Sequence, residues 1–170
     1  IRVGYRGSAS GALVQDPYFK KNISGATKAG IKVGLYFFTQ AVNEAEAVEE
    51  ASMAMSLASG YKVTYPIFID TESASNGRAN GLSKSARTAV VKAFCQTVRN
   101  GGYKAGVYAS KSWYANQLNA SALNGYCIWV AQYNSSCTYS GKYDMWQYSS
   151  KGSVSGIKGN VDMNISYTGY

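Results

Sequence analysis

Two carboxylates stand two positions apart, directly after an apolar run: Asp70 and Glu72 in the stretch YPIFIDTES, residues 65–73. On an extended chain such residues project to the same side, roughly 7 Å apart along the backbone. Two carboxylates so placed repel each other, and partial burial raises the pKa of at least one of them. One can then stay protonated near neutral pH while the other is ionised. The pair therefore predicts glycoside hydrolysis, in which an acid protonates the leaving oxygen and a second carboxylate stabilises the developing positive charge.

Two other interpretations of this pair remain open. Carboxylates at this spacing also occur in divalent metal sites, and either residue could cap a helix. The apolar run from Tyr65 to Ile69 has the composition of a buried strand, and functional groups of α/β barrels gather at the carboxyl ends of such strands. This position favours catalysis, and we expect neither a metal nor a cofactor.

The remaining acids are few enough to consider singly, because the chain has 9 Asp and Glu against 17 Lys and Arg. Asp16 precedes Pro17 and is placed to cap a helix. Asp144 is expected in a turn. Asp162 lies between Val161 and Met163, so its side chain faces away from theirs, toward solvent or a site. Four further acids crowd the first turns of one predicted helix, where the helix dipole and solvent favour negative charge: Glu44, Glu46, Glu49 and Glu50.

Composition excludes several classes of function. The chain has no histidine, which removes Ser-His-Asp and Cys-His catalysis and makes a zinc amidase improbable. Its formal charge of +8 predicts affinity for polyanions, such as nucleic acid or the anionic bacterial cell wall. The basic residues are scattered without a stripe, so we expect no nucleic-acid partner. No apolar run approaches the roughly 18–20 residues of a membrane span. The 15 tyrosines suit a groove that contacts sugars or bases, although half-buried surface would explain them too.

The three cysteines leave one question open. Cys127 and Cys137 flank the stretch IWVAQYNSS and could form a disulfide in an oxidising compartment. Cys95 falls in a helical pattern and is expected to be a small buried hydrophobe.

Helices and short apolar strands alternate along the chain. Helices are predicted from Asp16 to Gly30, from Asn43 to Gly60 and from about Ser83 to Asn100, with strands at 31–38 and 65–70 between them. Further strands are expected at 105–110, 126–133, 143–148 and 160–164, with little helix between the last ones. The first residues, IRVGYRG, have the pattern of a strand and not of a signal peptide. This order predicts an α/β protein with a parallel sheet or a barrel.

Several of these stretches together resemble the glycoside hydrolase family 25 lysozymes. The resemblance is carried by LVQDPYFKKNISGATKAGIKVGLYFFTQA, YPIFIDTES, GVYAS, IWVAQY and YDMWQYSS with GIKGNVDMN, in this order over nearly the whole chain. It implies an irregular TIM-like (β/α)5(β)3 barrel and one catalytic domain over residues 1–170. It also implies N-acetylmuramidase activity, the cleavage of the β-1,4 bond between N-acetylmuramic acid and N-acetylglucosamine in peptidoglycan. The implied location is the cell wall or the secreted fraction.

The resemblance also implies roles for individual residues. Glu72 would donate a proton to the glycosidic oxygen, and Asp70 would orient the substrate's N-acetyl group or stabilise the charge beside it. Asp162 would line the substrate groove. Four residues occupy strand positions from which some are expected to contact sugar, although barrel packing would explain each equally: Tyr36, Tyr108, Trp129 and Gln147.

One departure from the family pattern is large. The family opens with a strand that carries an aspartate, in a pattern like G-I-D-V-S, ahead of the segment that begins here at Ile1. We therefore expect the first barrel strand to be missing from this chain, with two exposed sheet edges and a dimer or strand-swapped assembly. The alternative function is a non-catalytic cell-wall-binding module that keeps the sugar groove.

Overall fold

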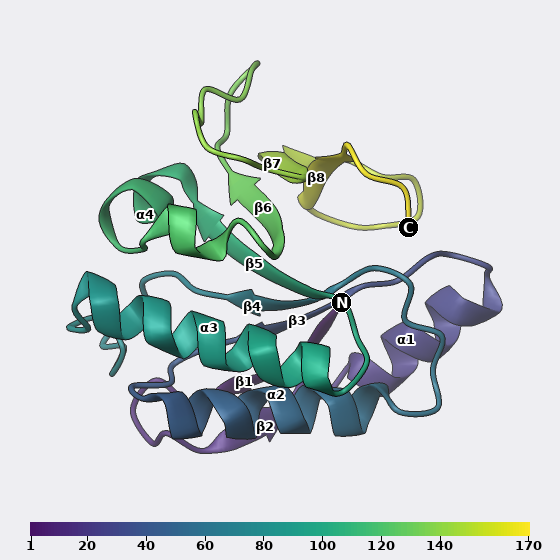
Figure 1. Cartoon of the computed structure of the whole chain (residues 1–170). Coiled ribbons are helices and arrows are strands. Elements are labelled where there is room, and N and C mark those ends of the chain that lie inside the picture. The colour runs from purple at the N-terminus through teal and green to yellow at the C-terminus, as the bar shows by residue number, and fades with distance from the viewer.

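The computed structural model describes all residues from Ile1 to Tyr170 as one eight-stranded sheet with helices packed along it (Figure 1). The strands lie in the order β2-β1-β3-β4-β5-β6-β7-β8. Their bounds are β1 Arg2–Arg6, β2 Leu13–Gln15, β3 Leu35–Phe38, β4 Ile67–Asp70, β5 Ala105–Ser110, β6 Cys127–Ala131, β7 Met145–Gly152 and β8 Val161–Ser166. Strands β1 and β3–β7 pair in parallel, whereas β2 and β8 each add to one end of the sheet in antiparallel orientation. The α/β class and the helix-poor final strands are as predicted.

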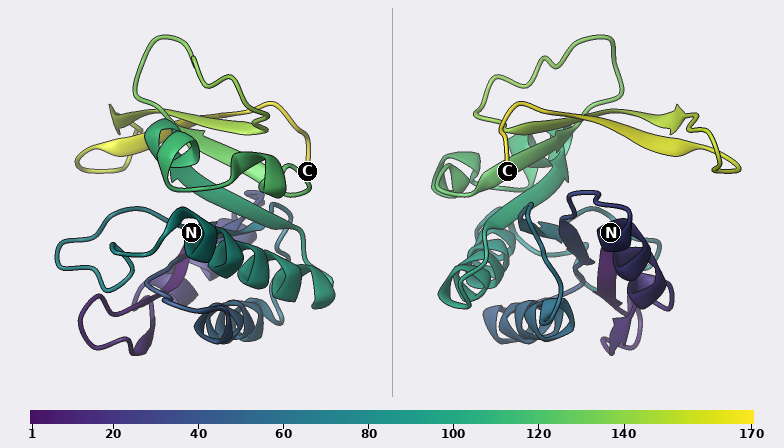
Figure 2. Two further views of the ribbon diagram at one scale, coloured as in Figure 1. Left: turned by 60° about the vertical axis from the view of Figure 1, so that its left-hand side comes forward. Right: turned by 90° about the vertical axis from the view of Figure 1, so that its right-hand side faces the viewer.

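The sheet is not closed into a complete barrel, because β2 and β8 do not pair with each other. Two further views show the β7–β8 hairpin on the side of the molecule opposite α2 (Figure 2). Strand β2 was not predicted from the sequence. It covers part of the outer edge of β1, pairing Gly4 with Gln15 and Arg6 with Leu13. The edge of β1 is therefore less exposed than a missing neighbour strand would leave it.

The helices are α1 Phe19–Lys28, α2 Glu44–Ala58, α3 Lys84–Asn100 and α4 Lys111–Asn116, followed by a 3₁₀ turn at Ala120–Leu123. Two begin where the sequence predicts: Asn43 Oδ1 accepts the N–H of Glu46, and Ser83 Oγ accepts the N–H of Ala86. The prediction for the first helix was wrong in detail. Tyr18 is its N-cap residue, and Asp16 instead accepts the Tyr18 N–H in the turn before it. None of the helices combines the length and the apolar character that crossing a membrane requires.

The glutamates at the start of α2 are structural, as predicted, but they are not all solvated. Glu50 is fully buried and accepts a hydrogen bond from Arg6 Nε at 2.9 Å. Glu46 pairs with Arg78 at 2.8 Å. These ion pairs connect α2 to β1 and to the loop that follows β4, so they stabilise the end of the sheet where that loop emerges.

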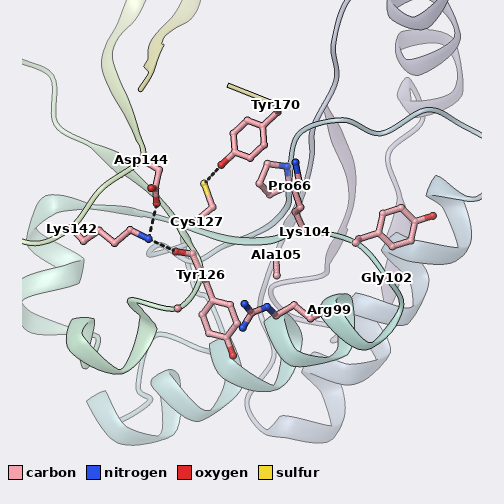
Figure 3. A pocket seen from close by; sticks show the side chains of 12 residues that line it. Pro66, Arg99, Gly102, Lys104, Ala105, Tyr126, Cys127, Lys142, Asp144 and Tyr170 are labelled. Carbon is pink, nitrogen blue, oxygen red and sulfur yellow. Dashed lines mark hydrogen bonds and ion pairs between the residues drawn. The ribbon is translucent and has the colours of Figure 1, made fainter. Parts of the chain in front are cut away.

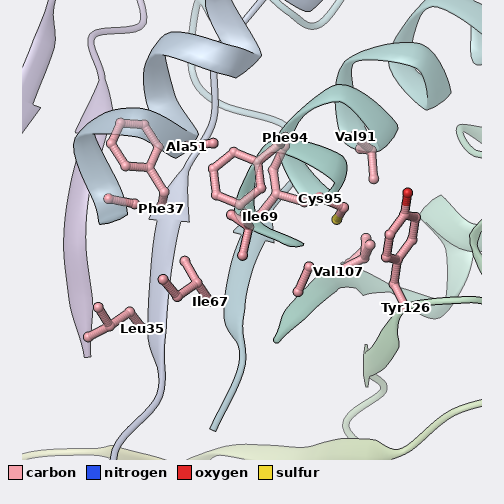
Figure 4. Packing of buried hydrophobic residues seen from close by; sticks show 14 of the residues in the cluster. Leu35, Phe37, Ala51, Ile67, Ile69, Val91, Phe94, Cys95, Val107 and Tyr126 are labelled. Carbon is pink, nitrogen blue, oxygen red and sulfur yellow. The ribbon is translucent and has the colours of Figure 1, made fainter. Parts of the chain in front are cut away.

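The core lies between the sheet and the helices, and strand alternation decides which residues enter it. Leu35, Ile67, Ile69 and Val107 point toward Phe94 and its neighbours on α2 and α3 (Figure 4). The residues between them on the same strands point to the other face, into the barrel. This alternation turns Tyr36, Phe68, Asp70 and Tyr108 away from the helices, because each is one position from a core residue.

The three cysteines are free thiols, so no disulfide joins Cys127 to Cys137. The hydroxyl of Tyr170 donates a hydrogen bond to Cys127 Sγ at 3.1 Å. Cys95, on the inner face of α3, is fully buried, as predicted. Its Sγ lies 3.6 Å from the carbonyl oxygen of Gly106 on β5.

Candidate active site

The predicted acids meet in one pocket of about 220 Å³ at the carboxyl ends of the strands. Its lining comes from β3, β4, β5, β6 and β8 and from the residues that follow β4 and β6. These lining residues are Tyr36, Asp70, Glu72, Tyr108, Trp129, Tyr133 and Asp162. The fold thus brings six of the seven sequence-predicted residues together, and the seventh, Gln147, lies directly behind them.

Asp70 is held rigidly by the strands on either side of it. Its carbonyl oxygen accepts the N–H of Thr39 at 3.0 Å, and the next residue, Thr71, donates its N–H to the carbonyl of Tyr108 at 3.1 Å. The side chain is buried, and Oδ1 has no hydrogen-bond partner. Burial and then the charge of Glu72 raise the pKa of Asp70 well above its ordinary value, while the Arg2 guanidinium opposes them. Asp70 therefore places a carboxyl group in the lining of the pocket, with one of its oxygens buried and unpaired.

Glu72 lies at the mouth of the same pocket, two residues beyond the strand, and its side chain reaches solvent. Partial burial and the negative charge of Asp162 raise its pKa. A carboxyl with a raised pKa retains its proton closer to neutral pH, which is the condition for a general acid. Asp162, exposed on β8, acts on Glu72 by charge alone.

Gln147 does not line the pocket but fixes two tyrosines that do. Its Oε1 accepts hydrogen bonds from Tyr108 Oη at 2.8 Å and from Tyr133 Oη at 3.0 Å. The amide is almost fully buried on β7. The sequence analysis left sugar contact and barrel packing both open for Gln147; in the structure it positions the two phenols that face the pocket.

Tyr133 was not singled out as a site residue, although it is the last residue of the strand predicted at 126–133; the structure ends β6 at Ala131 and leaves Tyr133 beyond it. Its ring is 59% exposed, so it stands at the rim of the pocket rather than in the wall. Its position two residues past the end of β6, on the same alternation as Trp129 and Ala131, was a signal that could have found it.

Aromatic packing builds the floor of the pocket. The Trp129 ring packs edge-on against Tyr108 with centroids 4.7 Å apart, and against Phe68 at 5.2 Å. Its indole N–H donates to Asn164 Oδ1 at 3.0 Å, which ties β6 to β8. The barrel-packing interpretation therefore holds for one side of Trp129, and the pocket-lining interpretation holds for the other.

A pair of charged residues beside the pocket also escaped the sequence analysis. Arg2 Nε and Asp16 Oδ2 are 2.7 Å apart, and Asp16 was assigned only to a helix cap. The positive charge of Arg2 opposes, without reversing, the rise in the pKa of Asp70 that burial and Glu72 cause. Such a pair joins residues fourteen positions apart on β1 and beyond β2, which no local pattern reveals.

The loop between Asp70 and α3 is fastened from two sides. Arg87, buried on α3, donates from Nη2 to the carbonyls of Ala79 and Asn80 at 3.0 and 3.2 Å, and its guanidinium stacks over the Trp113 ring. Arg78 of the loop is bound by Glu46 of α2. These anchors hold the segment that presents Glu72.

The other cavities are all larger than this pocket, and two of them adjoin the strands of the sheet. One, of about 470 Å³, is largely apolar, shares Tyr36 and Trp129 with the pocket of the acids, and extends from Ile1 to Asn164 and Ser166 of β8. The other, of about 460 Å³, lies at the opposite ends of the strands. We assign the candidate active site by its convergent carboxyls and not by its volume, because chemistry requires the former.

Comparison with known proteins agrees with this geometry. The sequence model of glycosyl hydrolases family 25 matches residues 3–157. An autolytic lysozyme of Clostridium acetobutylicum is 28% identical over 165 residues, which cover 96% of this chain and 48% of the relative. The chain spans about half the length of the curated relatives that it matches.

Solved structures show the same fold. The modular autolysin LytC from Streptococcus pneumoniae, in complex with a synthetic peptidoglycan ligand, matches with a TM-score of 0.81 and 26% identity over 96% of this chain and 39% of its own. A family 25 glycosyl hydrolase from Bacillus anthracis matches with a TM-score of 0.80 and 26% identity over 99% of this chain and 77% of its own. With the family model matching most of its length, this chain belongs to the glycosyl hydrolases of family 25.

Proposed function

We propose that residues 1–170 form one catalytic domain that cleaves the β-1,4 bond between N-acetylmuramic acid and N-acetylglucosamine in bacterial peptidoglycan. The observation that carries the proposal is the convergence of Asp70 and Glu72, both with raised pKa, in a pocket walled by aromatic rings. Flat aromatic faces suit sugar rings, and a protonated carboxyl suits a glycosidic oxygen. The lysozyme and autolysin names of the relatives support the substrate class.

In the proposed reaction Glu72 gives its proton to the glycosidic oxygen as the bond to the anomeric carbon breaks. The substrate's own acetamido oxygen then bonds to that carbon, a route known for glycosidases without a carboxylate nucleophile. The Asp70 carboxylate, which lines the pocket, accepts the acetamido N–H and holds the group in line for the attack. Glu72, now ionised, takes a proton from the water that opens the intermediate, which restores the starting state.

The test is Glu72→Gln, which keeps the shape of the side chain and removes its proton. We expect the release of new reducing ends from purified peptidoglycan to fall by about 10²–10⁴-fold, the usual contribution of general acid catalysis. Glu44→Gln is the matched control, because Glu44 is an exposed glutamate on α2 that does not line the pocket. Undiminished lysis by the Glu72 variant, with products identified by mass spectrometry, would refute the assignment.

The same assay separates the second candidate function, a wall-binding module without turnover. The unclosed sheet favours it, because β2 and β8 leave the barrel incomplete next to the site. Binding of the unaltered chain to peptidoglycan, with no new reducing ends at any pH, would establish that alternative. For either function we propose that the protein acts outside the cell, at the wall.

We further propose that an additional strand completes the sheet between β8 and the edge of β1 that β2 covers only in part, as the family resemblance implies. The apolar cavity of about 470 Å³ beside Ile1 and β8 supports a segment packed there. Either a longer form of the chain or a second copy could supply it, and the latter predicts a dimer by light scattering. Restoring a strand ahead of Ile1 should raise activity; equal activity of both forms, with residues 1–170 monomeric, would refute this proposal.

A further inference from the structure

A second polar pocket lies at the end of the barrel opposite the candidate active site (Figure 3). Its volume is about 460 Å³, and it is formed where β5 and β6 begin and where the chain enters β4 and β7. The side chains that line it include three cations from three separate segments: Arg99 at the end of α3, Lys104 ahead of β5 and Lys142 ahead of β7. Segments distant in the sequence thus converge on one hollow.

The charge in this pocket is not balanced. Asp144 is its only acid, and it is already occupied by Lys142 at 3.4 Å and by the N–H of Ile128 at 2.9 Å. Arg99 and Lys104 form no ion pair with any carboxylate. Two full positive charges therefore remain available to a ligand.

Aromatic rings hold these two cations in place. The Arg99 guanidinium lies 5.0 Å from the centroid of the Tyr126 ring, and Lys104 Nζ lies 4.6 Å from that of Tyr170. A ring steadies a cation without neutralising it, unlike a carboxylate. The arrangement resembles a receptor for an anion, because the donors are positioned in advance and their charge is retained.

We propose that this pocket binds a phosphate group of an anionic polyol-phosphate polymer of the bacterial wall. The planar fork of Arg99 matches the geometry of phosphate oxygens, and Lys104 adds a second charge on the Tyr170 side of the pocket (Figure 3). The tyrosine rings provide apolar faces for the carbon chain between phosphates. The choice of a wall polymer rests on the proposed function, whereas the preference for a phosphate anion rests on the pocket alone.

A phosphate site at this end leaves the candidate active site, at the carboxyl ends of the strands, free for a glycan strand. The formal charge of +8 would draw the protein toward a polyanion in general, and the pocket would add a defined point of attachment. The two ends of the barrel would then engage two different polymers at once.

The experiment measures equilibrium binding of a defined poly(glycerol phosphate) to the purified chain by calorimetry, at two salt concentrations. The pocket variant is Arg99→Gln with Lys104→Gln. Its matched control is Lys20→Gln with Lys21→Gln on α1, which removes the same two charges from exposed residues outside the pocket. We expect the Kd of the pocket variant to rise about tenfold and that of the control less than about twofold.

Inorganic phosphate and polyglutamate are the comparison ligands. We expect inorganic phosphate to compete with the polymer. We expect polyglutamate to bind more weakly, since its carboxylates stand on the side chains of a peptide and leave no polyol carbons to lie along the tyrosine rings. Equal losses of affinity in the two double variants would show that only net charge matters, and would overturn the proposed site. Tighter binding of polyglutamate or of duplex DNA would overturn the ligand class.

Binding is measured without turnover. If the protein proves not to hydrolyse peptidoglycan, the binding result still tests the phosphate site. Thermal unfolding of each variant checks that the Tyr126 stack is not needed for folding. If the double variant unfolds, the Kd of Lys104→Gln is compared with that of Lys20→Gln. Each of these variants removes one charge, so the comparison between pocket and control is kept. Absence of saturable binding by the unaltered chain overturns the proposal outright.

Discussion

The buried carboxyl group of Asp70 destabilises the fold but suits a residue that binds substrate. A buried carboxyl oxygen without a hydrogen-bond partner costs free energy that a core residue would not. The backbone on both sides of Asp70 is nevertheless fixed by β3 and β5, so the side chain cannot withdraw from its position. Such an unsatisfied group in a rigid frame is typical of a site that a substrate completes.

The first prediction concerns the stability of Asp70→Asn. A carboxyl whose pKa is higher in the folded than in the unfolded state favours folding only while protonated, and that contribution is lost as pH rises through the folded pKa. The asparagine variant carries no such penalty. We expect its free energy of unfolding at pH 7 to exceed that of the unaltered chain by about 1–3 kcal/mol, with the difference shrinking toward pH 4.

Urea unfolding between pH 4 and pH 8 measures this difference. Asp16→Asn is an informative comparison, because Asp16 is also buried but has Arg2 and the Tyr18 N–H as partners, so this change should destabilise the fold. A loss of stability in Asp70→Asn that is constant with pH would contradict the expected burial penalty.

The second prediction concerns the pH dependence of catalysis. The charge of Asp162 raises the pKa of Glu72, so Asp162→Asn should lower it. If protonated Glu72 is the acid, the alkaline limb of kcat/KM moves to lower pH. The measurement is hydrolysis of soluble peptidoglycan fragments from pH 4 to pH 8, with Glu44→Gln as the charge-matched control. A change in KM with an unmoved limb would limit Asp162 to substrate contact.

The residues of the site could be predicted unequally from the sequence. Asp70 and Glu72 stand out because a strand-like run ends in them, and alternation turns Asp162 away from its apolar neighbours. The position of Gln147 on β7 was predicted, but its role was not, because hydrogen bonds to Tyr108 and Tyr133 depend on three strands meeting. Long-range contacts of this kind leave no local periodicity.

At the scale of elements, the site depends on how closely β4 and β5 approach each other. Gly106 on β5 faces into the barrel beside Phe68, and a Cβ added there would lie 2.3 Å from the Phe68 ring. The ring fills this space and packs on Trp129 at the pocket floor. A glycine is required at this position because an aromatic neighbour occupies the place of its side chain.

The third prediction follows from this contact. Gly106→Ala should destabilise the fold by about 1–3 kcal/mol, the usual cost of overpacking, because Phe68 must move against Trp129. Gly81→Ala is the control, since a Cβ there meets nothing within 4 Å, and it should change stability by less than about 0.5 kcal/mol. Urea unfolding compares the two, and equal stabilities would show that the ring gives way without cost.

The elements that could be predicted are those whose signals are local. Asn43 and Ser83 cap their helices, and β5 spans the predicted residues because its apolar run is short and bounded. In α2 the small residues Ala47, Ala51 and Ala54 face the core, whereas the larger Val48 is exposed. Small alanines allow α2 to lie close to α3, so tertiary packing overrode the larger side chain. Strand β2 escaped prediction because three residues carry too little pattern.

For the whole molecule, the alternating βα order was enough to predict the class of fold but not the closure of the sheet. Whether β2 and β8 meet depends on twist summed over eight strands, which no single stretch encodes. The possible disulfide was likewise undecidable from spacing, because Tyr170, at the far end of the chain, occupies the neighbourhood of the Cys127 thiol.

The buried thiol of Cys95 can be used to detect transient separation of α3 from the sheet. A reagent that alkylates thiols cannot reach this sulfur unless α3 separates from β5, and burial raises the pKa of the thiol so that the reactive thiolate is scarce in the closed form. Cys127 and Cys137 are only partly buried and should react first. The labelling rate of Cys95, followed by mass spectrometry in increasing urea, should therefore approach the rate of global unfolding. If Cys95 reacted as fast as Cys137, α3 would separate from the sheet by local unfolding, without global unfolding of the protein.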